Sequence, residues 1–177
     1  GDNRINGDDK VVIGSTIPRY TFGLNIGANY KGIDLSMFFQ GVGKADGYLQ
    51  GPGIVPFVSG ESVGGTVLEE HKDYWTENNR NAAYPRLAFN ESNNNQVSTF
   101  WLKDASYLRL KNLQVGYTLP VNLTKKWGIN HLRFFANGTN LFTLDKFWKG
   151  YNVEAPTGMV NFYPQVKVYS FGLDRKS

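Results

Sequence analysis

Cysteine is absent from this chain of 177 residues, and histidine occurs only twice, as His71 and His131. The lack of cysteine excludes disulfides and thiolate metal sites, and it argues against a small disulfide-stapled secreted domain. The two histidines stand far apart in the sequence, so they form no local metal-binding motif. No stretch of about 18 consecutive apolar residues exists, and a transmembrane helix is therefore not expected.

Charged residues are also scarce. They make up 19% of the chain, against about 25% in ordinary soluble domains. Lysine and arginine are scattered, so the net charge of +4 does not gather into a basic run. Nucleic-acid binding is accordingly not expected.

Aromatic residues reach 15% and glycines number 20, which indicates an all-β chain. Within Tyr20–Tyr30, apolar side chains alternate strictly with Thr, Gly and Asn, the period-two pattern of a β-strand. A water-facing strand usually carries charged side chains, whereas this composition suits the crowded interior of a membrane barrel. The two tyrosines would lie about 33 Å apart along the strand, or about 25 Å along the membrane normal at a tilt of about 40°. That span matches a lipid-facing band with aromatic residues at both edges.

Four further strands are expected, at 33–40 after a tight Lys31-Gly32 turn, at 107–119, at 132–143 and at 165–173. Within 107–119 the parity of the apolar residues changes, which predicts either a β-bulge near Asn112 or a strand whose upper half leaves the membrane. The apolar parity of the strands predicts which side chains face lipid. They are Tyr20, Phe22, Leu24, Ile26, Tyr30, Ile33, Leu35, Met37, Phe39, Tyr169 and Phe171.

The connections between these strands alternate in length, as outer-membrane barrels alternate short periplasmic turns with long extracellular loops. The predicted fold class is an all-β, antiparallel up-and-down transmembrane β-barrel segment in the bacterial outer membrane. Its expected layout is an extracellular loop at 1–19, a β-hairpin of the barrel wall at 20–42, a long extracellular loop at 43–105, a second β-hairpin at 106–143, an extracellular loop at 144–164 and the final strand at 165–177. Five strands cannot close a barrel, so we expect further strands from missing sequence or from another chain.

Six segments carry a resemblance to a known family. They are 12–20 (VIGSTIPRY), 35–41, 100–112 (FWLKDASYLRLKN), 116–120, 138–142 (GTNLF) and 163–165 together with 170–173. In this order they resemble the C-terminal part of SusC/RagA-type TonB-linked outer-membrane transporters. The chain departs from the family pattern at its end, because Leu173 is followed by Asp174, Arg175, Lys176 and Ser177 rather than by a closing aromatic residue.

The resemblance implies a 22-stranded barrel with an N-terminal plug, energised by TonB and capped by a SusD-like surface lipoprotein. Members of the family import oligosaccharides or peptides in Bacteroidota. The expected partners are therefore the rest of the barrel and the plug, the SusD-like lipoprotein, the lipid bilayer and TonB, which acts through an N-terminal part missing from this chain. No TonB-contact residue is assigned, and no cofactor is implied.

Aromatic residues in the long loops are candidates for contact with a ligand or with the lid protein, since such rings stack on sugars or fill a partner's pockets. They are Phe57, Tyr74, Trp75, Trp101, Phe147, Trp148 and Tyr151. The alternative for these rings is packing of the loops against one another. A second reading of the whole chain is a soluble β-sandwich module that binds carbohydrate through its aromatic residues.

Chemistry within the chain is not expected. A short helix over 67–75 would carry Glu69, Glu70 and Asp73, but neighbouring carboxylates on a helix diverge and make a poor acid–base pair. The Asp and Asn residues of 2–9 resemble an incomplete calcium loop without the closing glutamate. A plain polar loop is the favoured interpretation there, and neither an enzyme nor a metal site is predicted.

Overall fold

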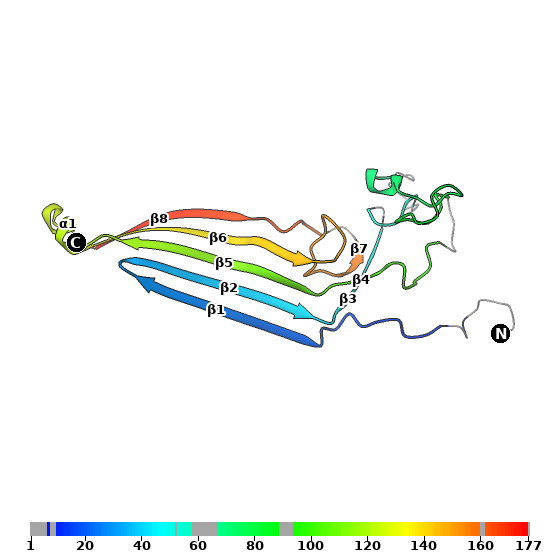
Figure 1. Ribbon diagram of the computed structural model, residues 1–177, viewed down its shortest axis with the longest axis horizontal. Helices are drawn as coiled ribbons and strands as arrows, with labels where there is room; N and C mark the ends of the chain where they lie inside the picture. The colour runs from blue at the N-terminus through cyan, green and yellow to red at the C-terminus, as the bar shows by residue number, and fades with distance from the viewer. Residues whose placement is uncertain are drawn as a thin grey trace.

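The computed structural model describes residue 7 and residues 10–51, 53–57, 67–88, 94–159 and 162–176. Its main element is a five-stranded antiparallel sheet in the order β1-β2-β5-β6-β8, whose long strands run side by side in Figure 1. These strands are β1 (Tyr20–Tyr30), β2 (Ile33–Gly43), β5 (Tyr107–Thr118), β6 (His131–Asp145) and β8 (Val168–Lys176). Within the described residues, β1 and β8 form the two edges of this sheet, each with one neighbouring strand.

The first two strands form the tight hairpin that the sequence predicts. Lys31 and Gly32 occupy the turn with φ values of 46° and 86°, and Tyr30 pairs directly with Ile33. Two consecutive residues with positive φ match the twist of a two-residue hairpin loop. A side chain at Gly32 would also collide with the Thr118 carbonyl of β5, which explains why the shortest connection uses glycine here.

Cross-strand pairing gathers the apolar positions of all five strands on one side of the sheet. Ile26 pairs with Met37, Met37 with Leu113, and Leu113 with Gly138, which in turn pairs with Tyr169. We call this side the apolar face. Its large side chains are Tyr20, Phe22, Leu24, Ile26, Tyr30, Ile33, Leu35, Met37, Phe39, Leu108, Leu110, Leu113, Val115, Tyr117, Phe134, Phe142, Leu144, Tyr169, Phe171 and Leu173.

Many side chains of the apolar face are exposed. The exposed fraction is 51% for Phe22, 53% for Leu24 and 83% for Phe171. The opposite side, which we call the polar face, carries mainly Thr, Asn, Ser, Gln and Gly along β1 and β2. The sheet therefore presents large apolar side chains on one side and mainly small polar side chains on the other.

A β-bulge in β5 keeps the apolar face continuous. Phe38 pairs with Asn112 and Phe39 with Leu110, which leaves Lys111 as the extra residue. The register of β6 shifts at the same level, where Asn140 adopts a left-handed φ of 52°. This irregularity is the bulge that the change of parity predicts near Asn112.

One ion pair crosses the polar face. The Arg133 guanidinium on β6 donates two hydrogen bonds to the Asp34 carboxylate on β2, at 2.8 and 2.6 Å. The intervening strand β5 contributes Gly116 directly beneath the pair, and a side chain at this position would collide with both partners. The absence of a side chain at position 116 is thus what allows β2 and β6 to interact across β5.

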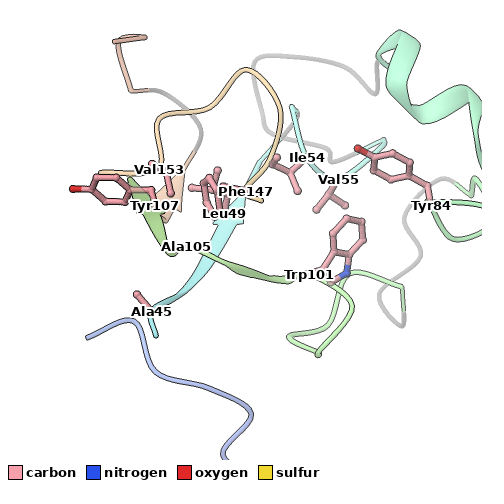
Figure 2. Packing of buried hydrophobic residues seen from close by; sticks show 10 residues of the cluster. All are labelled: Ala45, Leu49, Ile54, Val55, Tyr84, Trp101, Ala105, Tyr107, Phe147 and Val153. Carbon is pink, nitrogen blue, oxygen red and sulfur yellow. The ribbon is translucent and has the colours of Figure 1, made fainter. Parts of the chain in front are cut away.

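The hydrophobic core lies beyond one end of the long sheet, among the loops. A small second sheet, β4 (Leu102–Asp104), β3 (Asp46–Gln50) and β7 (Thr157–Met159), forms part of it. Figure 2 shows the buried cluster, which consists of Ala45, Leu49, Ile54, Val55, Tyr84, Trp101, Ala105, Tyr107, Phe147 and Val153. The sequence pattern predicts loops here and gives no sign of β3, β4 or β7, which are only three to five residues long.

The connections differ at the two ends of the sheet. One end has the Lys31-Gly32 turn and the β5–β6 connection, which contains the helical turns α1 (Val121–Thr124) and η3 (Lys125–Trp127). The other end has the long loops and the described part of the N-terminal segment (Figure 1). No helix in the described residues is long and apolar enough to cross a membrane.

Three elements differ from the sequence expectation, and the first is β2, which continues beyond residue 40 to Gly43. The last strand begins at Val168 rather than at residue 165 and continues to Lys176, because Asp174 and Arg175 pair with β6 instead of forming a charged tail. The helix expected over 67–75 is only the single 3-10 turn η2 (Glu69–Lys72). A local hydrogen bond from the Leu68 amide to His71 Nδ1 holds this turn.

His71 is a fully buried titratable group of the loop region. Its ring packs edge-on against Tyr84 at a centroid distance of 4.8 Å. Burial lowers the pKa of His71, and this effect outweighs the opposite influences of the Ile54 backbone and of Glu70. His71 is therefore neutral in the folded loop core over a wider pH range than in the unfolded chain.

We expect the loop core to lose stability as the pH falls below about 6.5, the pKa of an unperturbed histidine. Below that pH the unfolded chain takes up a proton that folded His71 does not, so protonation favours unfolding with a slope of up to about 1.4 kcal/mol per pH unit. Melting followed by near-ultraviolet circular dichroism at pH 7.5 and 5.5 measures this effect. His71→Gln should weaken the pH dependence and His131→Gln should leave it intact, and an undiminished dependence in His71→Gln would contradict the assignment.

Candidate functional site

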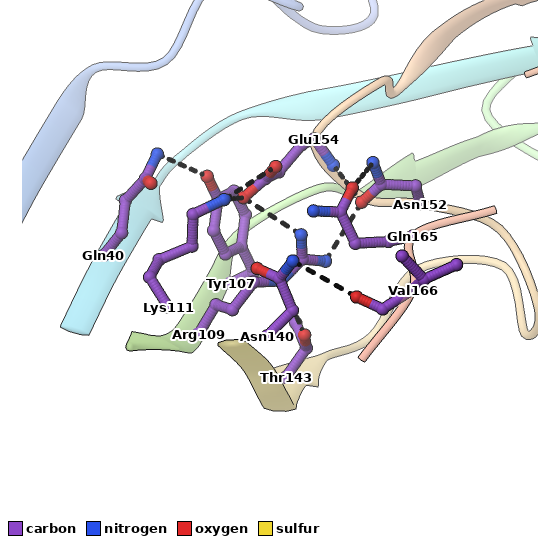
Figure 3. Close-up of polar contacts among 10 residues, drawn as sticks. All are labelled: Gln40, Tyr107, Arg109, Lys111, Asn140, Thr143, Asn152, Glu154, Gln165 and Val166. Carbon is purple, nitrogen blue, oxygen red and sulfur yellow. Dashed lines mark hydrogen bonds and ion pairs between the residues drawn. The ribbon is translucent and has the colours of Figure 1, made fainter. Parts of the chain in front are cut away.

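A charged cluster lies where the polar face meets the long loops (Figure 3). Arg109 and Lys111 extend from β5, and both reach Glu154 in the loop between β6 and β8. The Lys111 ammonium lies 2.9 Å and the Arg109 guanidinium 3.0 Å from the same carboxylate oxygen, Glu154 Oε1. Two cations thus share one loop carboxylate, which anchors the loop to the sheet.

Arg109 is the centre of this cluster, with only 4% of its surface exposed. Its Nε donates to the Thr143 hydroxyl at 2.7 Å, and its Nη2 donates to the Asn152 side-chain carbonyl at 3.0 Å. The contact of Nη1 with Glu154 has ion-pair distance but not hydrogen-bond geometry. A buried guanidinium needs such partners because an unpaired charge away from water is costly.

Amide side chains continue the network along the loop. Asn152 Nδ2 donates to the Gln165 side-chain carbonyl at 3.2 Å, and Asn140 Nδ2 donates to the Val166 backbone carbonyl at 3.3 Å. At the β2 side, Gln40 donates to the Tyr107 hydroxyl at 3.1 Å. The loop after β6 is therefore fixed to the five-stranded sheet at several points. Asn152 contacts both Arg109 of the sheet and Gln165 at the far end of the loop.

Two cavities adjoin this network. The larger, of about 600 Å³, is lined by Arg109, Asn140, Phe142, Thr143, Asp145, Gly150, Tyr151, Asn152, Pro164, Gln165 and Lys167. The second, of about 310 Å³, shares Gly150, Tyr151, Asn152 and Pro164 with it and adds Leu49, Leu68, Glu70, Lys149, Ala155, Phe162 and Tyr163. Tyr151 stands between the two, so they form neighbouring parts of one recess that offers amides, a hydroxyl, both charge signs and aromatic carbon.

The lining of the larger cavity offers hydrogen-bond donors and acceptors of both charge signs. Within the residues described, no three Asp, Glu or His side chains lie close enough together to hold a metal ion. The calcium-like segment 2–9 lies outside the described residues, except for Gly7. Of the three carboxylates considered for chemistry, Glu69 forms an exposed ion pair with Lys72, and Asp73 accepts hydrogen bonds from Asn79 and Ala83.

The loop aromatics are placed unequally. Trp101 is 1% exposed, and its indole N–H donates to the Asn94 carbonyl at 2.9 Å. Phe147 is likewise buried. Trp148 packs parallel to Tyr84 at a centroid distance of 6.3 Å and lies beneath the Lys103 ammonium. These three rings pack the loops against one another. This packing is the alternative to ligand contact that the sequence left open.

The remaining candidates are more accessible. Trp75 is 38% exposed, Tyr74 packs partly buried against the edge of the loop core, and Tyr151 lines both cavities. Phe57 is partly buried. Contact with a ligand or a lid remains a prediction for these four residues.

Sequence reasoning missed the charged cluster itself. Arg109 and Lys111 lie inside a predicted strand, and Glu154 lies about forty residues further on, so nothing local links them. One signal was present: charged residues at 109 and 111 adjoin the change of parity that predicts the bulge. A bulge commonly redirects a side chain toward a site, and Lys111 is the bulged residue.

We expect Glu154→Gln to loosen the loop from the wall. The substitution leaves buried Arg109 and half-buried Lys111 without their carboxylate, and we expect it to cost roughly 2 kcal/mol. Breaking a fully buried pair costs about 3 to 5 kcal/mol. The cost is lower here because Lys111 and Glu154 remain partly exposed to solvent. Hydrogen exchange of the amides in 148–155 should accelerate accordingly. Glu69→Gln removes an exposed ion pair and serves as the control with little effect, and unchanged protection in Glu154→Gln would refute the anchoring role.

Comparison with known proteins gives consistent relatives, although no family model matches the chain. TonB-dependent receptor P3 of Formosa agariphila is 27% identical over 99% of this chain and 18% of the receptor. TonB-dependent receptor P26 of the same organism is 30% identical over 89% of this chain and 15% of the receptor.

Solved structures agree with these relatives. A chain of the RagAB peptide importer in its closed-closed state matches with a TM-score of 0.74 and 28% identity, over 97% of this chain and 19% of that chain. The open-open state matches with a TM-score of 0.73 and the same identity and coverage. This chain thus spans less than a fifth of the length of the proteins it matches. Motifs, fold and relatives together show that the chain is similar to one segment of the SusC/RagA-type TonB-dependent receptors.

Proposed function

We propose that this chain forms part of the wall and the extracellular loops of a transporter in the bacterial outer membrane. The complete protein imports oligosaccharides or peptides, is energised by TonB and works with a SusD-like lipoprotein. The observation that carries the proposal is the exposed apolar face opposite a polar face on a sheet with two open edges. Lipid is the environment in which an exposed apolar face of this size is stable.

The size of the face supports this environment. Five strands about 4.8 Å apart and about ten residues long cover on the order of 800 Å². Soluble monomers rarely expose a contiguous apolar patch larger than a few hundred Å². The open edges β1 and β8 would leave backbone groups unpaired in lipid, so further strands of the complete protein close the barrel at both sides.

The polar face then lines the barrel interior, and the short-turn end lies at the periplasm. The recess around Arg109 and Tyr151 opens at the extracellular end, where an incoming substrate meets the wall. Amides and charges of both signs match the backbone and termini of a peptide, and the similar solved structures are of a peptide importer. These observations favour peptides over oligosaccharides. We further propose that Trp75, which is exposed, contacts the lid lipoprotein.

The soluble β-sandwich is the weaker alternative. A sandwich buries one face of each sheet against the other sheet. In the described part of this chain, the apolar face lies uncovered, and the second sheet has only short strands among the loops. Several aromatic side chains that would serve as a carbohydrate platform are instead buried in the loop core.

Leu24→Arg tests the lipid-facing assignment. Leu24 lies at the middle of β1 on the apolar face, where an arginine at the bilayer midplane costs about 2 to 4 kcal/mol. We expect a corresponding loss of stability in urea titrations of the complete protein folded into phospholipid vesicles. The neighbouring Asn25→Arg places the same side chain on the polar face and should cost much less. Equal effects of the two substitutions would contradict the facing.

Uptake by intact cells tests transport and substrate class together. Cells that lack the gene encoding this chain should lose accumulation of labelled oligopeptides, and a plasmid copy of the gene should restore it. A protonophore should abolish uptake in wild-type cells, because TonB-dependent import needs the proton gradient. Loss of oligosaccharide uptake instead would reverse the substrate preference. Unchanged uptake of both classes, with the protein present in the outer membrane, would overturn the import function.

A further inference from the structure

The β5–β6 connection presents exposed apolar side chains at the short-turn end of the sheet. Val121 and Leu123 of α1 are exposed, and Trp127 of η3 is 64% exposed. Leu132 shares its parity with the exposed Phe134 of the apolar face and is nevertheless buried. The element α1 contacts the strand β6. The exposed apolar side chains of this connection therefore lie next to the end of the apolar face.

Positive charge surrounds this turn. Lys31, Lys125, Lys126 and Arg175 are all exposed at the same end. The only acidic residues in 28–36, 114–135 and 170–176 are Asp34 and Asp174. Asp34 pairs with Arg133 across the polar face, and Asp174 lies 3.7 Å from His131 on that same face. Both of these acidic side chains therefore lie on the polar face, whereas Arg175 pairs with Leu132 on the apolar face.

An apolar groove of about 640 Å³ begins next to these cations. On the apolar face it is lined by Ile33, Val115, Tyr117, Phe134, Ala136 and Phe171. Ala136 pairs with Val115 on one side and Phe171 on the other, so a small side chain between two larger ones forms the floor. A hydrocarbon chain fits such a groove between strands.

The cations and the groove are aligned by the strand register. Arg175 pairs with Leu132, and Leu173 pairs with Phe134 at the wall of the groove. Two residues along a strand correspond to about 7 Å, so the Arg175 backbone lies one step beyond the end of the groove. At the other side, Ile33 follows the Lys31-Gly32 turn directly and pairs with Tyr117.

We infer that this end of the sheet is a binding site for an anionic glycerophospholipid of the periplasmic leaflet. The phosphate and its anionic headgroup contact Lys31, Lys125, Lys126 and Arg175, Trp127 lies at the headgroup level, and one acyl chain occupies the groove. Tryptophan prefers this interfacial depth, and basic clusters attract anionic headgroups. The inference rests on the proposed membrane location, and it adds a lipid preference that the location alone does not require.

Native mass spectrometry of the complete protein, extracted from outer membranes in detergent, tests the site. Phosphatidylglycerol and phosphatidylcholine with identical acyl chains are offered in equal amounts. We expect about tenfold more bound phosphatidylglycerol, and we expect the preference to disappear in the triple variant Lys125→Gln, Lys126→Gln, Arg175→Gln, since each basic residue near the headgroup contributes substantially to anionic lipid binding. Ala136→Leu fills the groove and should reduce the binding of both lipids.

The control variant Lys10→Gln, Lys72→Gln, Lys146→Gln removes three charges at the loop end and should keep the preference. Excess inorganic phosphate should not displace the lipid, because phosphate has no acyl chain to occupy the groove. Displacement of the lipid would show that the site binds phosphate alone, and it would overturn the proposal. Equal binding of the two lipids, or a preference that survives in the triple variant, would also overturn it. If the protein is found in the outer membrane but shows no preference, this inference alone fails, whereas absence from the outer membrane removes the proposed function as well.

Discussion

The antiparallel register between β2 and β5 places Leu35 beside Val115 and Met37 beside Leu113, and the neighbouring pairs repeat this match across all five strands. A slip of one residue in any pair would exchange the two faces of that strand. The exposed apolar face, the polar face and the position of the charged cluster all depend on this register. The hairpin turn at Lys31-Gly32 fixes it for β1 and β2, and the Asp34–Arg133 ion pair spans β5 at the level of Gly116.

The long strands could be predicted from the sequence because each one carries its own periodicity. The alternation in Tyr20–Tyr30 identifies β1 to the residue, and the change of parity in 107–119 identifies the bulge. The loop core could not be predicted in the same way. Trp101, Tyr84 and Phe147 come from three separate segments, and each of the strands β3, β4 and β7 is too short to show a period. An aromatic residue in a loop has the same sequence signature whether it is buried, as Trp101 is, or exposed, as Trp75 is.

The same distinction applies to the candidate site. Sequence reasoning places the site in the loops and nominates aromatic side chains, whereas the structure adds a polar network centred on Arg109. The partners of Arg109 lie 34 and 43 positions away in the sequence, so the network exists only once β5, β6 and the following loop have assembled. Buried charges within a strand of mostly apolar and small polar side chains are costly without partners. Their presence indicates a nearby carboxylate, but the sequence does not identify which one.

The bulge at Lys111 affects both the apolar face and the charged cluster around Arg109. Without the extra residue, the parity set by Leu108 and Leu110 would continue to Asn112, Gln114 and Gly116, and these polar or small residues would occupy the apolar face. With it, Leu113, Val115 and Tyr117 take those places. The same insertion sets Lys111 beside Arg109, where both meet Glu154. One bulge therefore has two effects. It keeps the apolar face apolar from Leu113 to Tyr117, and it brings Lys111 beside Arg109, where both bind Glu154 of the loop after β6.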